Sequence, residues 1–195
     1  MAEPMSSTDP RQAVFLDRDG VLIENRDGYV KSWAEVEVLE QAVEACKLLS
    51  EAGYPIVVVT KQQVVGKGIL TLEETEILNE EILNVFRSKG ANIVGSYLCH
   101  HLAEEGCNCR KPRPGMLLQA SIEHGIDLAR SCMVGDALTD IQAADAAGVT
   151  GILVRTGRGV RQEPLVTEAF GSRCAVFDDM LAAASYILVS SGVQR

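Results

Sequence analysis

The segment AVFLDRDG, residues 13–20, joins a short apolar run to two aspartates and a glycine. An uninterrupted apolar run of this length is typical of a strand that is buried on both faces of a parallel sheet. Five similar runs follow along the chain: PIVVVT (55–60), NIVGSYL (92–98), CMVGD (132–136), GILVRT (151–156) and CAVF (174–177). The sequence therefore predicts six strands, of which AVFLD (13–17) is the first.

Helical patterns separate these strands. The segment TLEETEILNEEILNVFRSKG (71–90) opens with a Thr71–Glu74 capping box, and other stretches have apolar residues at helical spacing or stop on a glycine. These other stretches are VLEQAVEACKLLSEAG (38–53), PGMLLQASIEHG (114–125), LTDIQAADAAG (138–148) and MLAAASYILV (180–189). Repeated alternation of strand and helix predicts an α/β fold with a mainly parallel sheet covered on both faces.

Length and composition limit the classes of protein that fit. The 195 residues suit one domain, which we expect to span 13–190 after a flexible polar leader, 1–12. A formal net charge of -9 argues against nucleic-acid and anionic-membrane partners, and no apolar run is long enough to span a membrane. Without a recognisable secretion signal, six cysteines are not expected to form a disulfide framework. We expect a cytoplasmic monomer.

Polar residues follow four of the predicted strands. Asp17 and Asp19 come after the first strand, Thr60 ends the second, Lys111 follows the third, and Asp136 ends the fourth. Each residue alone is a weak signal, because aspartate, threonine and glycine are common in loops. In parallel sheets, however, ligands bind at the carboxyl ends of the strands, where these side chains would meet.

The four segments FLDRDG, VVTKQQ, CRKPRPGM and MVGDALTDIQAA resemble the four motifs of the haloacid dehalogenase (HAD) superfamily of phosphotransferases. The GYV after the first motif, the C-x-H…C-x-C segment and CRKPRPGM resemble more narrowly the heptose-bisphosphate and histidinol-phosphate phosphatases. The resemblance covers residues 13–160. It implies a Rossmann-like three-layer α/β/α fold and a Mg²⁺-dependent phosphatase.

The resemblance also implies roles for the residues at the strand ends. Asp17 would attack phosphorus to form an aspartyl-phosphate, and Asp19 would act as the acid and base. Thr60 and Lys111 would hold the phosphoryl oxygens. The Mg²⁺ ligands would be Asp17, the backbone carbonyl of Asp19, and Asp136.

Asp140 lies inside the next predicted helix. We expect it beside the magnesium site rather than on the metal, and an acidic residue that merely occupies the first helical turn is an equal alternative.

The segment CHHLAEEGCNC (99–109) carries a tetrahedral ligand set for Zn²⁺ in Cys99, Cys107, Cys109 and one histidine. Either His100 or His101 could serve as the fourth ligand, and the resemblance, with its C-x-H pattern, favours His101. A closed set of three cysteines and one histidine leaves no position for substrate. We therefore expect a structural zinc that fixes the loop before Arg110 and Lys111.

The spacing between the motifs leaves no room for a cap domain. Thr60 lies 41 positions after Asp19, and Lys111 lies 51 positions after Thr60, which one helix, one strand and their loops already fill. An open site suits a small phosphate ester. The resemblance implies a sugar phosphate, first of all D-glycero-D-manno-heptose 1,7-bisphosphate. The expected substrate contacts are Arg110, Lys61, Gln62, Gln63, Asp27, Gly28 and Tyr29.

Two positions depart from the pattern of the resembling group. Lys61 stands where an asparagine is typical, and Ala137 stands where heptose-bisphosphate phosphatases typically have lysine. Lys61 could bind phosphate, but we expect that it disturbs the loop and that restoring asparagine raises kcat. A histidinol-phosphate phosphatase, another small phosphate-ester phosphatase and a catalytically weakened sugar-phosphate-binding protein remain alternatives.

Overall fold

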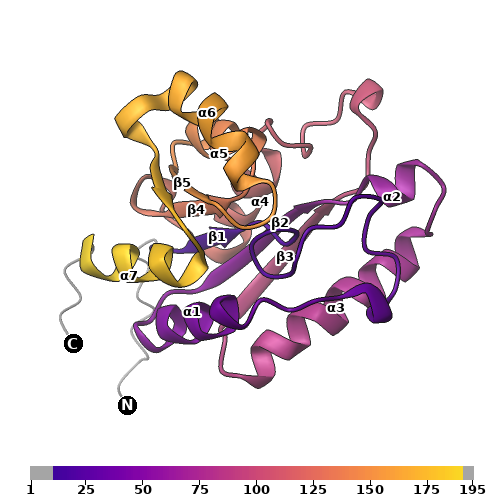
Figure 1. Ribbon diagram of the computed structural model, residues 1–195, viewed down its shortest axis with the longest axis horizontal. Helices are drawn as coiled ribbons and strands as arrows, with labels where there is room; N and C mark the ends of the chain where they lie inside the picture. The colour runs from indigo at the N-terminus through magenta and orange to yellow at the C-terminus, as the bar shows by residue number, and fades with distance from the viewer. Residues whose placement is uncertain (1–10, 191–195) are drawn as a thin grey trace, which may run out of the picture.

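The computed structural model describes residues 11–190, and a six-stranded parallel sheet forms its centre (Figure 1). The spatial order is β3-β2-β1-β4-β5-β6. The strands are β1 (Val14–Leu16), β2 (Ile56–Lys61), β3 (Ile93–Cys99), β4 (Cys132–Gly135), β5 (Thr150–Val154) and β6 (Ala175–Phe177). All neighbouring pairs are parallel, which confirms the predicted α/β class.

Helices cover both faces of this sheet (Figure 1). One layer contains α1 (Glu40–Glu51), α3 (Leu72–Ser88) and α7 (Met180–Ser190). The other layer contains α4 (Gly115–His124), α5 (Leu138–Ala147) and α6 (Gly159–Phe170). The capping box predicted for α3 is present, since Thr71 Oγ1 accepts from the Glu74 N–H and Glu74 Oε2 accepts from the Thr71 N–H.

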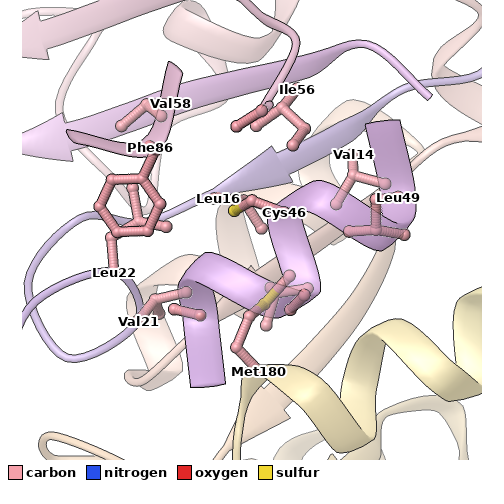
Figure 2. Close-up of a cluster of buried hydrophobic side chains, with 14 of the residues drawn as sticks. Val14, Leu16, Val21, Leu22, Cys46, Leu49, Ile56, Val58, Phe86 and Met180 are labelled. Carbon is pink, nitrogen blue, oxygen red and sulfur yellow. The ribbon is translucent and has the colours of Figure 1, made fainter. Parts of the chain in front are cut away.

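Alternating residues of the strands build the two halves of the core. In β1, Val14 and Leu16 pack toward α1, whereas Phe15 packs on the opposite face against α4 and α5. Figure 2 shows the first half, where Cys46 and Leu49 of α1 lie near the strands. Burial of apolar surface on both faces explains why the strand sequences are continuously apolar.

Two helices differ from the sequence-based expectation. The segment QQVVGKG (62–68), for which the sequence analysis predicted no helix, contains the one-turn helix α2 (Gln63–Gly66). Helix α6 was not predicted, because its sequence begins at a glycine and carries Pro164 in its interior, both of which are unfavourable for helices.

The expected leader falls mostly outside the described residues, because residues 1–10 are not described. Arg11, within the expected leader, already forms a parallel bridge with Ile126. Within the described chain, no helix is both long and apolar enough to span a membrane.

The strand order positions the site. The chain runs from β1 outward to β2 and β3, and then returns to the other side of β1 with β4, so the winding reverses between β1 and β4. A crevice forms at such a reversal, outside the carboxyl ends of the strands. Among the described residues, only loops and short helical turns lie between β1 and α1 and between β2 and α3, so neither connection holds a cap domain.

Candidate active site and metal centres

Asp17 leaves the end of β1 at the point where the winding reverses. Its backbone N–H donates to the Val134 carbonyl at 3.0 Å, which extends the pairing of β1 with β4 by one residue. Its side chain is buried, and Oδ1 accepts from the Arg18 N–H at 2.8 Å. The backbone thus fixes this carboxylate at the floor of the crevice.

Lys111 neutralises the carboxylates beside it. Its buried ammonium lies 2.9 Å from Asp17 Oδ1 and 2.7 Å from Asp140 Oδ1, and it donates to the Val59 carbonyl at 3.0 Å. Burial alone lowers the pKa of this lysine, but the two carboxylates outweigh burial and raise the pKa overall. Lys111 therefore stays charged and is held from three sides.

Asp19 lies closer to solvent than Asp17. The guanidinium of Arg18 contacts its carboxylate at 3.1 Å, and Gln62 Nε2 donates to Oδ2 at 2.7 Å. The same Gln62 nitrogen donates to Thr60 Oγ1 at 2.8 Å. Gln62 thus links the end of β2 to Asp19 and orients both side chains toward a common space.

Asp136 is buried after β4 and is paired with Arg158, a residue that the sequence analysis missed. The guanidinium donates to Oδ1 at 2.8 Å and to Oδ2 at 3.2 Å, and the Arg158 backbone N–H donates to Oδ2 at 2.9 Å. Burial raises the pKa of Asp136 to about 6, against the lowering effect of Arg158. An additional cation at this carboxylate would favour its ionised form.

Three carboxylates form a cluster at the floor of the crevice. Asp17, Asp136 and Asp140 each place an oxygen within 4.8 Å of the others. Buried like charges at this spacing repel one another unless cations lie close to them. Sets of carboxylate oxygens of this kind suit Mg²⁺. Asp140 is already engaged by Lys111 and by the Ala137 N–H, which donates to Oδ2 at 3.1 Å.

An open cavity of about 250 Å³ lies over this cluster. Its walls include all the expected substrate contacts except Arg110: Asp27, Gly28, Tyr29, Lys61, Gln62 and Gln63. Asp17, Asp19 and Arg158 also line it. A larger cavity of about 400 Å³ lies around Cys132 and Thr150 at the opposite ends of β4 and β5, but its walls hold no carboxylate, so we place the chemistry in the smaller one.

The predicted zinc ligands converge into a second cluster. The sulfurs of Cys99 and Cys107 lie 3.7 Å apart, those of Cys109 and Cys107 3.4 Å, and His101 Nδ1 lies 3.8 Å from Cys99 Sγ and 3.3 Å from Cys109 Sγ. Disulfide sulfurs would lie about 2 Å apart, so these thiols are free. The separations suit four ligands around one ion at Zn²⁺ bond lengths of about 2.0–2.3 Å.

His101, rather than His100, belongs to this cluster. His100 instead stacks on the His101 ring, with the ring centroids 4.2 Å apart. This arrangement favours the histidine that the C-x-H pattern selected.

Arg110 connects the cysteine loop to α2. Its Nη1 donates to the His101 carbonyl at 3.1 Å, and Nη2 lies 2.7 Å from the Gln63 amide oxygen in the amide orientation that satisfies both groups. Arg110 therefore lies at the junction of two loops.

Lys61 ends β2 and reaches across the crevice to α5. Its ammonium donates to Thr139 Oγ1 at 3.0 Å. The side chain is largely buried, and burial lowers its pKa, opposed by the carboxylate of Asp140. Lys61, which belongs to the second motif VVTKQQ, therefore also contacts the fourth motif MVGDALTDIQAA.

The structure brings the four predicted motifs together but adds one residue from a fifth strand end. Arg158 follows GILVRTG, the run that forms β5, and so obeys the same rule that identified the other residues. Extending that rule from four strand ends to five would have placed it among the candidates. Its partner Asp136 lies 22 positions away, so the pairing itself has no local signal.

Comparisons with known proteins agree with this arrangement. A family model described as HAD-hydrolase-like matches residues 108–184. The D-glycero-beta-D-manno-heptose-1,7-bisphosphate 7-phosphatase of Pseudomonas aeruginosa is 34% identical, with 91% of this chain and 98% of the relative covered. The Yersinia pestis protein of the same name is 43% identical, with coverages of 77% and 84%.

Solved structures of heptose-bisphosphate phosphatases are also similar to this chain. The D,D-heptose 1,7-bisphosphate phosphatase of B. bronchiseptica, complexed with magnesium and phosphate, superposes with a TM-score of 0.85 at 30% identity, covering 92% of this chain and 99% of that one. The corresponding protein of Burkholderia thailandensis gives a TM-score of 0.69 at 29% identity, with coverages of 91% and 99%.

Proposed function

The chain belongs to the HAD-like phosphatases, in the group of the heptose-bisphosphate phosphatases, and from this premise we propose that its substrate is D-glycero-D-manno-heptose 1,7-bisphosphate. The names of the relatives support this substrate. The observation that carries the phosphatase reaction is the pair of aspartates with different surroundings. Asp17 is buried against Lys111, and Asp19 lines the open cavity beside Gln62. Such a pair suits one nucleophile and one acid and base.

We propose that Mg²⁺ is held by Asp17, Asp136 and the backbone carbonyl of Asp19. The clustered, buried carboxylates support this assignment, because their mutual repulsion falls when a cation binds. A bound Mg²⁺ would neutralise phosphoryl oxygens of the substrate. We assign Asp140 to holding Lys111 rather than to the metal.

We assign two steps to residues of this chain: transfer of the phosphoryl group to Asp17, and hydrolysis of the aspartyl-phosphate. An Asp17 oxygen attacks phosphorus while the bond from phosphorus to the sugar oxygen breaks, and Asp19 gives that oxygen its proton. In the second step Asp19 removes a proton from water, the water oxygen bonds to phosphorus, and the bond to Asp17 breaks to release phosphate. Thr60 and Lys111 hold the phosphoryl oxygens in both steps.

We propose that Cys99, His101, Cys107 and Cys109 bind a structural Zn²⁺. All four ligands come from the protein, so the ion would complete the fold of the loop rather than contact substrate. The loop leads directly into Lys111, whose ammonium must meet Asp17 at 2.9 Å. Zinc would thus support catalysis by fixing the position of a residue that it does not touch.

We further propose that residues 13–190 act as one catalytic domain, as a monomer in the cytoplasm. Three free thiols in a zinc set are consistent with a reducing compartment. Size-exclusion chromatography with light scattering measures the oligomeric state.

Phosphate release from a panel of substrates tests the function. The panel contains heptose 1,7-bisphosphate, heptose 7-phosphate, histidinol phosphate and p-nitrophenyl phosphate, each with Mg²⁺ and with EDTA. We expect the highest kcat/KM on the bisphosphate. Preference for histidinol phosphate would reject the substrate, and no Mg²⁺-dependent release from any ester would reject the phosphatase itself.

A further inference from the structure

The ammonium of Lys61 lies between two parts of the site that are far apart in sequence. Lys61 ends β2, and its hydrogen-bond partner Thr139 is the second residue of α5. Helix α5 begins after Ala137, the position where the resemblance led us to expect a lysine. The cationic side chain of Lys61 therefore reaches the first turn of α5, which has no lysine or arginine of its own.

A second cation close to Lys111 would be repelled unless carboxylates lay near it. Asp140, whose carboxylate lies 2.7 Å from Lys111, also attracts Lys61, and Asp17 attracts it too. Arg158 and Lys111 oppose them, and burial lowers the pKa of Lys61 more than any of these charges changes it. The three carboxylates of the cluster, Asp17, Asp136 and Asp140, thus match the three cations Lys61, Lys111 and Arg158 in number.

The hydrogen bonding of the Lys61 ammonium is incomplete. An ammonium has three N–H donors, and among the described residues Thr139 Oγ1 is the one acceptor within hydrogen-bond distance. Lys61 also lines the cavity together with Asp17, the proposed nucleophile. An anion placed over Asp17 would therefore meet donors that the protein leaves available.

We propose that Lys61, held in place by Thr139, is a second phosphate-binding cation of the active site. This inference rests on the proposed function, because it places the phosphate of the substrate over Asp17. It reverses the expectation from sequence that Lys61 lowers kcat and that asparagine would raise it. Lys61 contacts phosphate before, during and after transfer, so it strengthens the binding of substrate, transition state and product alike.

Uniform binding of this kind has a kinetic signature. It lowers KM without raising kcat, because the barrier from the bound substrate is unchanged. It also makes inorganic phosphate a stronger inhibitor. Thr139 acts as a positioning residue, since it touches Lys61 and not the phosphate.

The test is binding of inorganic phosphate in the presence of Mg²⁺, measured by isothermal titration calorimetry. Lys61→Met removes the charge at similar size, Lys61→Arg keeps the charge, and Lys61→Gln serves as a second neutral variant if Lys61→Met unfolds. We expect the neutral variants to weaken phosphate binding and to raise KM by about tenfold, with kcat changed less than about threefold. Lys61→Arg should stay within about threefold of the parent in phosphate affinity, and Thr139→Val should fall between the parent and Lys61→Met.

Several outcomes would overturn the inference. Phosphate binding by Lys61→Met at the parent affinity would do so, as would an Lys61→Asn variant with raised kcat and unchanged KM. Equal losses of phosphate affinity in Lys61→Arg and Lys61→Met would show that the lysine acts only in packing. A parent protein that binds phosphate but hydrolyses no ester would contradict the proposed function and leave this binding test intact.

Discussion

Two clusters of ionisable side chains, Asp17 with Asp136 and Asp140 and the set of three cysteines with His101, differ in how their charges are balanced. The carboxylate cluster around Asp17 is balanced mostly by the protein's own cations, Lys111 and Arg158, and opens to a cavity. The cysteine cluster places four atoms that could bind a metal within 4.8 Å of one another and forms no wall of that cavity. A site for chemistry keeps positions open to substrate, whereas a site for structure uses every ligand internally.

The comparison predicts that loss of Asp17 removes activity but not stability. We expect Asp17→Asn to lower kcat on the order of 10³-fold or more, because the nucleophile is lost while the side-chain volume is kept. The melting temperature should stay near that of the parent. A loss of activity smaller than tenfold would contradict the assignment of the nucleophile.

The cysteine cluster should behave in the opposite way, with stability lost first. The purified protein should hold one zinc per chain that survives dialysis against weak chelators, while activity also depends on added Mg²⁺. We expect Cys107→Ser and His101→Ala to lose zinc and to lower the melting temperature, with activity falling as the Lys111 loop loosens.

His100→Ala is the matched control for the zinc ligand set, because His100 neighbours His101 but stands outside the cluster. It should keep zinc, as measured by metal analysis of the dialysed protein. If Cys107→Ser bound zinc and matched the parent in stability and activity, the zinc would not be structural.

Arg158 allows the carboxylate cluster to be tested without touching a ligand. Arg158→Gln removes a positive charge near the proposed Mg²⁺ and leaves Asp136 buried with fewer donors. Because repulsion between the guanidinium and Mg²⁺ exceeds the benefit of the two hydrogen bonds by which the guanidinium orients Asp136, we expect Mg²⁺ affinity to rise by about three- to tenfold. Calorimetric titration with Mg²⁺ measures this directly.

The same substitution should lower the stability of the protein when Mg²⁺ is absent. Without Mg²⁺, Arg158→Gln should melt below the parent, since a buried carboxylate has lost its partner, and saturating Mg²⁺ should close most of the gap. Weaker Mg²⁺ binding in this variant would mean that Arg158 serves mainly to orient Asp136.

The smallest effect is expected at the start of α3, which contributes no residue to either cluster. Thr71→Ala removes the capping hydrogen bond to the Glu74 N–H at the start of α3. We expect the melting temperature to fall by about 2–4 °C with kcat and KM unchanged. A change in kcat or KM would show that a modest loss of stability is enough to alter activity. The activity changes of the other variants could then not be assigned to the residues that were replaced.

Much of this arrangement could be predicted from sequence because the signals are local. A buried strand requires a continuous apolar run, and Thr71 with Glu74 marks a helix start within four residues. The cysteine cluster is equally local, since its ligands span only residues 99–109. The strand ends then bring Asp17, Thr60 and Lys111 together through a general property of parallel sheets.

What could not be predicted depends on side chains that meet only in the folded protein. The Arg158–Asp136 pair and the Lys61–Thr139 hydrogen bond join residues 22 and 78 positions apart. Nothing in either sequence segment specifies its partner. Helix α6 was missed for a local reason, since Pro164 opposes the helix that burial of Val166 against Leu153 stabilises.

The most direct test of the account is to trap the phosphoryl group on Asp17. Protein mixed with heptose 1,7-bisphosphate and Mg²⁺ is quenched after milliseconds, reduced with borohydride and analysed by peptide mass spectrometry. We predict that position 17 alone is converted to homoserine, that the signal requires substrate and Mg²⁺, and that Asp17→Asn does not give it. Conversion at another carboxylate, or rapid turnover with position 17 unmodified, would contradict the central claim.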